Sequence, residues 1–89
     1  MPYITRERRA LYDDRIATLS QQITDATPAG DLNYMVTRLL LDWLGKRGPS
    51  YAALADVVAV LETAKLEFYR RAAAPYEDEK IAENGDVYG

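Results

Sequence analysis

The sequence contains no cysteine and no histidine, and these two absences remove several kinds of chemistry. Without cysteine there are no disulfides and no thiol nucleophile. Without both residues the chain lacks the ligands of most zinc and copper sites, and it lacks the commonest general acid and base. We therefore expect no metal and no cofactor. An enzyme built from this chain would have to use carboxylates, lysine, arginine or tyrosine.

Long apolar runs are also missing, and none approaches the roughly 20 residues that are needed to cross a bilayer. The first charged residue, Arg6, comes too early for a secretory signal peptide. The net charge of -3 offers no basic excess of the kind that nucleic-acid binding requires. These features predict a soluble cytoplasmic protein that binds neither membranes nor nucleic acid.

The most apolar stretch runs from Asp31 to Leu44 and reads DLNYMVTRLLLDWL. As a helix it leaves only a narrow polar stripe, in which the Arg38 guanidinium can lie against the Tyr34 ring and pair with Asp42. A chain of 89 residues has few elements with which to cover so apolar a helix. We therefore expect a homo-oligomer. The main apolar face consists of Leu32, Met35, Val36, Leu39, Leu40 and Trp43, and Leu41 and Leu44 extend it.

Capping and turn residues divide the chain into four expected helices. Thr5, Asp31 and Ser50 are suitable N-caps, and Pro75 suits the first position of a last helix. The sequence therefore predicts an all-α fold in one domain, residues 1–89, with a bundle of three main helices and a short C-terminal helix. The expected helices span residues 6–24, 31–45, 51–74 and 75–84.

Lys65 interrupts the apolar stripe of the third helix at a position where leucine would be expected. Its stem could pack while its ammonium reaches solvent and pairs with Glu62. Alternatively, Lys65 could point into a pocket or an interface, where it would bind an anion. The rest of that stripe is Leu54, Val57, Val58, Leu61, Phe68 and Ala72.

Cations and tyrosines gather around Lys65 and just before Pro75, and the chain has seven tyrosines in all. Lysine and arginine can hold phosphates, and tyrosine rings can stack on a base. We therefore expect a nucleotide-type ligand. The candidate ligand-binding residues are Lys65, Tyr69, Arg70, Arg71, Tyr76, Arg38 and Tyr34.

A magnesium-dependent nucleotide pyrophosphohydrolase of the MazG type is the main enzymatic alternative. Such sites need several carboxylates that converge on the metal. Glu62 and Glu67 lie about 140° apart around a helix, so they cannot share a metal ion. Glu79 and Glu83 are suitably spaced, but they lie in the short terminal helix. The expectation is therefore that the chain is not an enzyme and has no catalytic residues.

Three segments carry a resemblance that covers residues 30–88: GDLNYMVTRLLL, SYAALADVVAVLETAKLEFYRR and APYEDEKIAENGDVYG. They resemble a family of small hypothetical proteins that recur in bacteriophage and environmental viral genomes. The resemblance implies a phage accessory protein in the cytoplasm of the bacterial host. Proteins of that class commonly act by binding a host protein or a nucleotide signal of host defence, and many are homo-oligomers.

Together these observations predict an anti-defence protein that sequesters a small anionic, nucleotide-derived ligand at a subunit junction. The alternative is an inhibitor that binds a host protein through its acidic C-terminal segment, residues 76–89, which has five acids and one base. A structural role in the virion is a further possibility.

Overall fold

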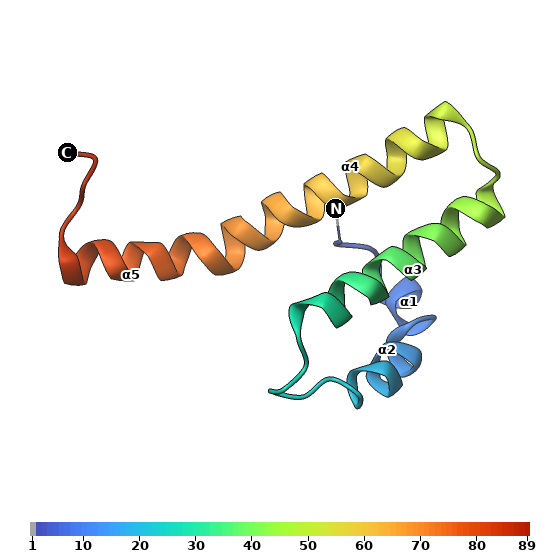
Figure 1. Ribbon diagram of the computed structural model, residues 1–89, viewed down its shortest axis with the longest axis horizontal. Coiled ribbons are helices and arrows are strands. Elements are labelled where there is room, and N and C mark those ends of the chain that lie inside the picture. The colour runs from blue at the N-terminus through green and yellow to red at the C-terminus, as the bar shows by residue number, and fades with distance from the viewer. Residues whose placement is uncertain (1) are drawn as a thin grey trace. The chain divides into compact units, whose positions relative to one another are not determined.

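The computed structural model describes residues 2–89, and in this range every regular element is helical (Figure 1). The prediction of an all-α chain is therefore confirmed. Contacts divide the chain into two compact units, residues 2–57 and 58–89, and the boundary falls within α4. The elements are α1 (Arg6–Ala10), α2 (Asp13–Ser20), α3 (Ala29–Arg47), α4 (Tyr51–Phe68), the π-helical turn η1 (Tyr69–Ala73) and α5 (Ala74–Asn84).

The first expected helix is two short helices in the structure. Thr5 caps α1 as predicted, because its side-chain oxygen accepts a hydrogen bond from the Arg8 N–H at 3.3 Å. The chain then tightens, since the N–H groups of Leu11 and Tyr12 donate to carbonyls three residues back instead of four. The prediction of one helix to Thr24 is wrong for this reason. A second helix, α2, starts after the turn with two aspartates in its first turn, where the helix dipole favours negative charge.

Helix α3 begins at Ala29, two residues before the expected cap Asp31. Pro28 precedes the helix with an extended backbone (φ -70°, ψ 154°), a conformation that its ring already favours. Asp31 therefore lies within the first turn, where its charge is favourable although it does not serve as the N-cap.

The end of α3 also differs from the expected position. The helix passes through Gly45 and ends at Arg47. Gly48 follows with a φ of 91°, which a residue with a side chain rarely adopts, and its N–H donates to the Leu44 carbonyl at 3.0 Å. Lys46 and Arg47 thus lie in the last turn, at the negative end of the helix dipole.

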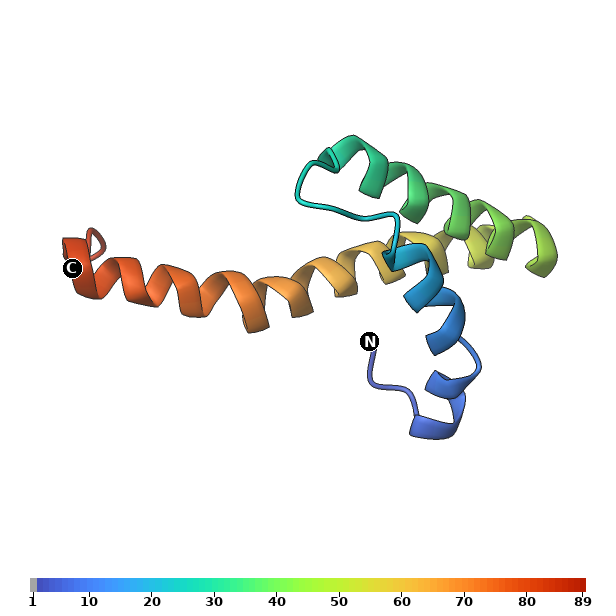
Figure 2. The ribbon, with the colours of Figure 1, turned by 90° about the horizontal axis from the view of Figure 1, so that it is seen from below.

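Pro75 changes the spacing of the backbone hydrogen bonds in the C-terminal unit, but the chain stays helical through this region. Proline has no N–H, and its ring would clash with the carbonyl four residues earlier, at Arg71. The chain widens before the proline, so that the Ala74 N–H donates to Tyr69, five residues back. Figure 2 shows the ribbon continuing through this turn into α5. The predicted α-helix to Ala74 therefore ends at Phe68, whereas the predicted stop at Asn84 is confirmed.

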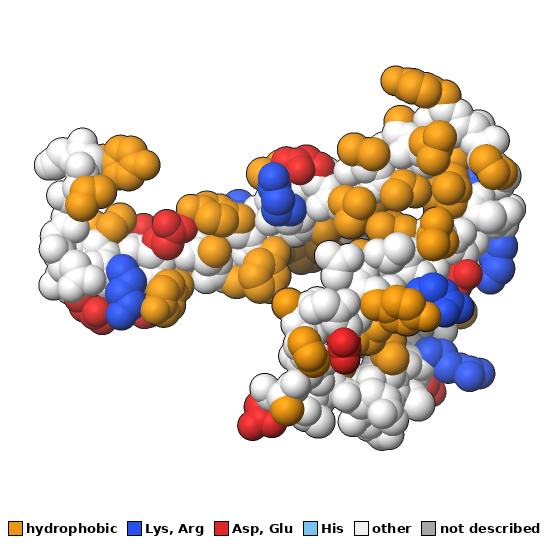
Figure 3. Space-filling view, in the orientation of Figure 1, with side chains coloured by type: hydrophobic (Ala, Val, Ile, Leu, Met, Phe, Trp, Pro, Cys, Tyr) orange, Lys and Arg blue, Asp and Glu red, His pale blue; other side chains and the backbone are white. Residues whose placement is uncertain are grey.

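Within residues 2–89, Ala53 is the only buried side chain. It lies in the first turn of α4, where its N–H donates to the predicted cap Ser50 at 3.1 Å. Large apolar side chains remain on the surface, as the space-filling view shows (Figure 3). Leu39 and Val58, for example, are 64% and 65% exposed. The helices are thus defined by local caps and turns, and most of their apolar area is available for further contacts.

We expect Pro75→Ala to convert the π turn into an ordinary α-helical turn, because alanine restores the missing N–H and removes the ring. Loss of one residue from the turn would rotate α5 by about 100° relative to the preceding helix. The free energy of unfolding should rise, by up to about 3 kcal/mol. Backbone NMR shifts and amide contacts of residues 68–78 would report the change. Pro49→Ala, between α3 and α4, is the control, and persistence of the five-residue step in Pro75→Ala would contradict the explanation.

Candidate functional site

Lys65 lies on the surface of the C-terminal unit beside the partner that the sequence predicts. Its Nζ is 3.2 Å from Glu62 Oε1, so the expected pair across one helical turn is present. The two side chains are 69% and 53% exposed. An exposed pair of this kind adds only about 0 to 1 kcal/mol to stability, so it does not explain why a lysine occupies the apolar stripe.

Tyr69 and Glu77 form a second contact, which depends on the π turn. The Tyr69 hydroxyl donates a hydrogen bond to Glu77 Oε1, although eight residues separate them. In an uninterrupted α-helix this spacing would leave them about 80° apart. The hydrogen bond and then the charge of Glu77 raise the pKa of Tyr69, and the nearby Tyr88 adds to this effect.

Of the remaining candidates of this unit, Arg70 and Tyr76 have neighbours of their own. Arg70 donates to Glu67 Oε1 at 2.6 Å. Lys80 lies above the Tyr76 ring, with its Nζ 5.5 Å from the centroid. Arg71 is exposed in η1. The cations and rings that the sequence selects are therefore present on this helix, and several of them already interact with each other or with an acid.

Tyr34 and Arg38 belong to the other unit, and the predicted contact between the Arg38 guanidinium and the Tyr34 ring is present, whereas the predicted ion pair of Arg38 with Asp42 is not found among the described residues. Arg38 Nη1 donates to the Tyr34 hydroxyl at 2.7 Å, and its Cζ is 5.7 Å from the ring centroid. The hydrogen bond and charge of Tyr34 raise the pKa of Arg38, and Asp42 raises it further. This cluster holds its guanidinium in place along α3.

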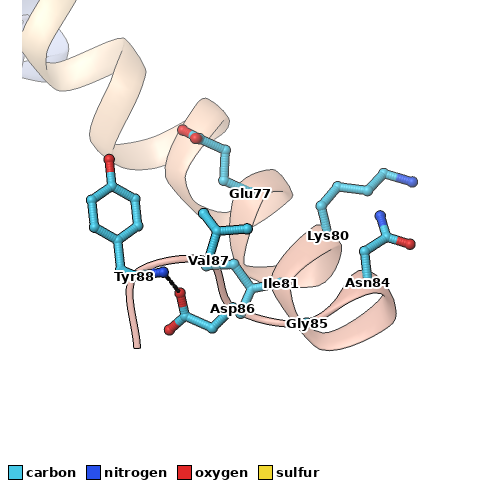
Figure 4. A pocket seen from close by; sticks show the side chains of 8 residues that line it. All are labelled: Glu77, Lys80, Ile81, Asn84, Gly85, Asp86, Val87 and Tyr88. Atoms are coloured by element: carbon cyan, nitrogen blue, oxygen red, sulfur yellow. Dashed lines mark hydrogen bonds between the residues drawn. The ribbon is translucent and has the colours of Figure 1, made fainter.

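A groove at the C-terminal end of the chain was not predicted (Figure 4). Gly85 has a φ of 93° and redirects the chain after α5, and the Tyr88 N–H then donates to Asp86 Oδ1 at 2.8 Å. The groove is open to solvent and has a volume of about 300 Å³. The sequence signal for it is the Asn84-Gly85 stop, which by itself predicts only the end of a helix. The groove is lined by Glu77, Lys80, Ile81, Asn84, Gly85, Asp86, Val87 and Tyr88.

A smaller hollow of about 270 Å³ lies beside Trp43, Lys46 and Arg47. Arg47 stacks on the indole, with its Cζ 4.9 Å from the ring. The spacing of an aromatic residue and a cation four residues later could have revealed this contact. Both cations also interact favourably with the C-terminal end of α3, so the arrangement stabilises the helix end.

Two kinds of feature are absent from the described part of the chain. Among residues 2–89, no three acidic side chains gather closely enough to hold a metal ion. None of the helices in the same range is long and apolar enough to span a membrane.

The raised pKa of Tyr69 gives a direct test of its bond to Glu77. The folded protein favours the protonated phenol, so the stabilisation is complete below pH about 10, the ordinary tyrosine value, and is lost as the pH rises through the raised pKa. We expect Glu77→Gln to lower the Tyr69 pKa toward that ordinary value, because the carboxylate charge is removed. An NMR titration of ring-labelled tyrosine, assigned with Tyr69→Phe, measures this. Glu79→Gln should leave the Tyr69 pKa almost unchanged, and an equal effect of both variants would contradict the contact.

Of three comparisons with known proteins, one gives a match. The comparison with curated proteins gave no match, and the comparison with solved structures gave none either. A family model described as a domain of unknown function, DUF6899, matches residues 1–87. The chain therefore belongs to the DUF6899 family.

Proposed function

We propose that this protein is a self-associating helical binding protein that holds a small anionic, nucleotide-derived ligand at a junction between subunits. The observation that carries the proposal is the exposure of the apolar faces. Ala53 is the only buried side chain in residues 2–89, whereas Leu39, Val58 and many similar residues are more than half exposed. Apolar surface of this extent is typical of proteins that bind a partner.

Stability supports the same proposal. Fixing each residue of a helix costs roughly 1 to 2 kcal/mol of backbone entropy, and in proteins most of a helix's stability comes from the packing of its apolar face. Helices α3 and α4, of 19 and 18 residues, bury too little surface to offset that cost. Association would supply the missing contacts at about 25 cal/mol for each Å² of apolar surface that it buries. In this proposal a bundle of three main helices forms together with the oligomer.

The proposed ligand follows from the charge of one short segment. Lys65, Arg70 and Arg71 place three cations on α4 and η1, and Tyr69 lies between Lys65 and Arg70 in the sequence. Arg70 already contacts Glu67 at 2.6 Å, and so it is held in place. An anion that carries an aromatic base suits this combination of cations and rings. The phage origin and the anti-defence role are also part of the proposal, and they are supported only by the resemblance of residues 30–88.

The principal rival is inhibition of a host protein through the acidic segment that includes Glu77, Asp78 and Glu79. Asp78 and Glu79 are exposed on α5, which favours attraction to a basic surface. Glu77 is engaged by Tyr69, and this reduces its availability for such a partner. The rival needs no small ligand, and the two proposals therefore differ in a measurable way.

Self-association is tested by light scattering coupled to gel filtration, from low to high micromolar protein. We expect a mass of at least two chains and a melting temperature that rises with concentration, because binding to the folded state stabilises it by mass action. A mass of one chain throughout this range would contradict the proposal. Dilution back to the lowest concentration should reverse the effect, which separates specific association from aggregation.

Ligand binding is tested by thermal shift with a panel of nucleotides and cyclic nucleotides. A ligand present at about a hundred times its Kd should add about 2.7 kcal/mol to the free energy of unfolding. Arg71→Gln should weaken that ligand tenfold or more, because a hydrogen bond to a charged group is worth about 1.5 to 3 kcal/mol. Arg15→Gln, at an exposed position of α2, is the matched control. Failure of every nucleotide to stabilise the wild type would favour the rival that binds a host protein.

A further inference from the structure

One face of the C-terminal helix can be followed from α4 into α5. Lys65 pairs with Glu62 and lies four residues before Tyr69. Tyr69 donates to Glu77 across the π turn, so these two side chains share a face. Glu77 in turn lines the groove with Ile81, one helical turn later. The π turn therefore connects the lysine of α4 and the groove of α5 into one continuous surface.

This surface carries apolar side chains at both of its ends. Val58 and Leu61 are 65% and 45% exposed on α4, and Ile81 is 43% exposed on α5. An acid and a base lie beside the apolar residues at each end of the surface. Counted inward from each end, the acid comes first on α4 and the base comes first on α5. From the α4 end the order is Glu62 and then Lys65, and from the α5 end it is Lys80 and then Glu77. Such a pattern is complementary to itself when it is reversed.

The self-complementary order of these residues is seen when the helix is paired in the antiparallel direction with the same helix of a second copy. When the two-fold axis passes at the level of Arg71, residues equally far before and after Arg71 lie opposite each other. The four α5 residues that line the groove then meet either an opposite charge or the α4 apolar residues. The opposed pairs are Glu77 with Lys65, Lys80 with Glu62, Ile81 with Leu61, and Asn84 with Val58.

We infer that the groove on α5 is a docking surface for the middle of α4 from a second copy of this chain. The contact is reciprocal, so every opposed pair occurs twice. This inference rests on the proposed self-association and adds the face, the orientation and the register to it. The partner's Leu61 enters the groove beside Ile81, and the partner's Lys65 reaches Glu77.

The centre of the pairing is compatible with close approach. Tyr69 lies opposite Ala73 of the second copy, and the small alanine leaves room for the ring. Arg70 and Arg71 of both copies lie at the level of the two-fold axis, and Glu67 offsets the charge of Arg70 at 2.6 Å. Arg71 comes two residues after Tyr69, about half a turn around the helix, and it therefore lies on the side that faces away from the paired surface.

The register also gives Lys65 a role that explains its position in an apolar stripe. Within one chain it is an exposed cation beside Glu62. In the pair it lies between Glu62 of its own helix and Glu77 of the second copy, and one cation then serves two carboxylates. A leucine at this position would bury more apolar area but would lose the preference for the antiparallel orientation.

A charge exchange tests the register. Lys65→Glu and Glu77→Lys each place like charges opposite each other twice, and we expect each to raise the dimer dissociation constant at least tenfold in sedimentation equilibrium. The double variant Lys65→Glu/Glu77→Lys restores opposite charges and should return to within about threefold of the wild type. Within each chain, the double variant still has two negative charges side by side, at positions 62 and 65, and it still lacks the hydrogen bond from Tyr69 to Glu77. Because these defects within the chain are not repaired, recovery of the dimer would have to come from the contact between chains.

Asp78→Lys is the matched control, since it reverses a neighbouring charge that does not line the groove. Circular dichroism of each variant at high concentration checks that its helices remain. If the wild type were a single chain throughout, the proposed function itself would fail. If the wild type associated but the single variants had no effect, or the double variant did not recover, only this register would be overturned.

The antiparallel orientation of the two helices can be tested independently with spin labels. Because the chain has no cysteine, a label attaches only at a cysteine that is introduced. Spin labels at Ala72→Cys should lie close together across the two-fold axis. Labels at Ala82→Cys should be separated by about 33 Å along the pair, since each residue away from the axis adds about 3 Å. Pulsed electron spin resonance measures both distances. Short distances at both positions would indicate parallel pairing and would overturn the inference.

Discussion

The widened turn between Phe68 and Ala74 decides which side chains of the C-terminal unit can act together. Pro75 offers no N–H and its ring excludes the usual carbonyl, so the backbone adds a residue to one turn. That addition rotates everything beyond it. Tyr69 and Glu77, eight residues apart, come into hydrogen-bond contact as a result. The face of α4 that carries Lys65 consequently continues into the groove on α5, and both the candidate site and its proposed partner depend on this continuity.

The stability of the helices rests on local contacts to an unusual degree. Ser50 caps α4, Gly48 and Gly85 end two helices with positive φ, and charges lie at the favourable ends of the helix dipoles. Each contact of this kind is worth about 1 kcal/mol or less, and together they define helices without packing them. The apolar faces remain for a second contact, which the proposed self-association supplies. A ligand at the subunit junction would then be bound and the oligomer stabilised by the same event.

The charges of the C-terminal helix form short pairs within one turn, namely Glu62 with Lys65, Glu67 with Arg70 and Lys80 with Glu83. All of these pairs are at least partly exposed, so they contribute little to the stability of an isolated chain. Their order along the helix matters more than their individual strength. Opposite charges in a self-complementary order determine orientation and register when two apolar faces of similar shape could meet in several ways.

The sequence by itself determined the all-α class, the caps at Thr5 and Ser50 and the end of the last helix at Asn84, because each depends on residues within one turn. It also predicted the Glu62–Lys65 pair and the arrangement of Tyr34 and Arg38, since contacts four or fewer residues apart follow from helical geometry. It did not predict the break before α2, the π turn or the C-terminal groove. A sequence pattern projected at a constant 100° per residue cannot predict that a turn contains one added residue. That residue shifts every later side chain around the helix. In a regular helix, other positions would continue the face of Lys65. The π turn of the folded backbone places Glu77 and Ile81 on that face instead.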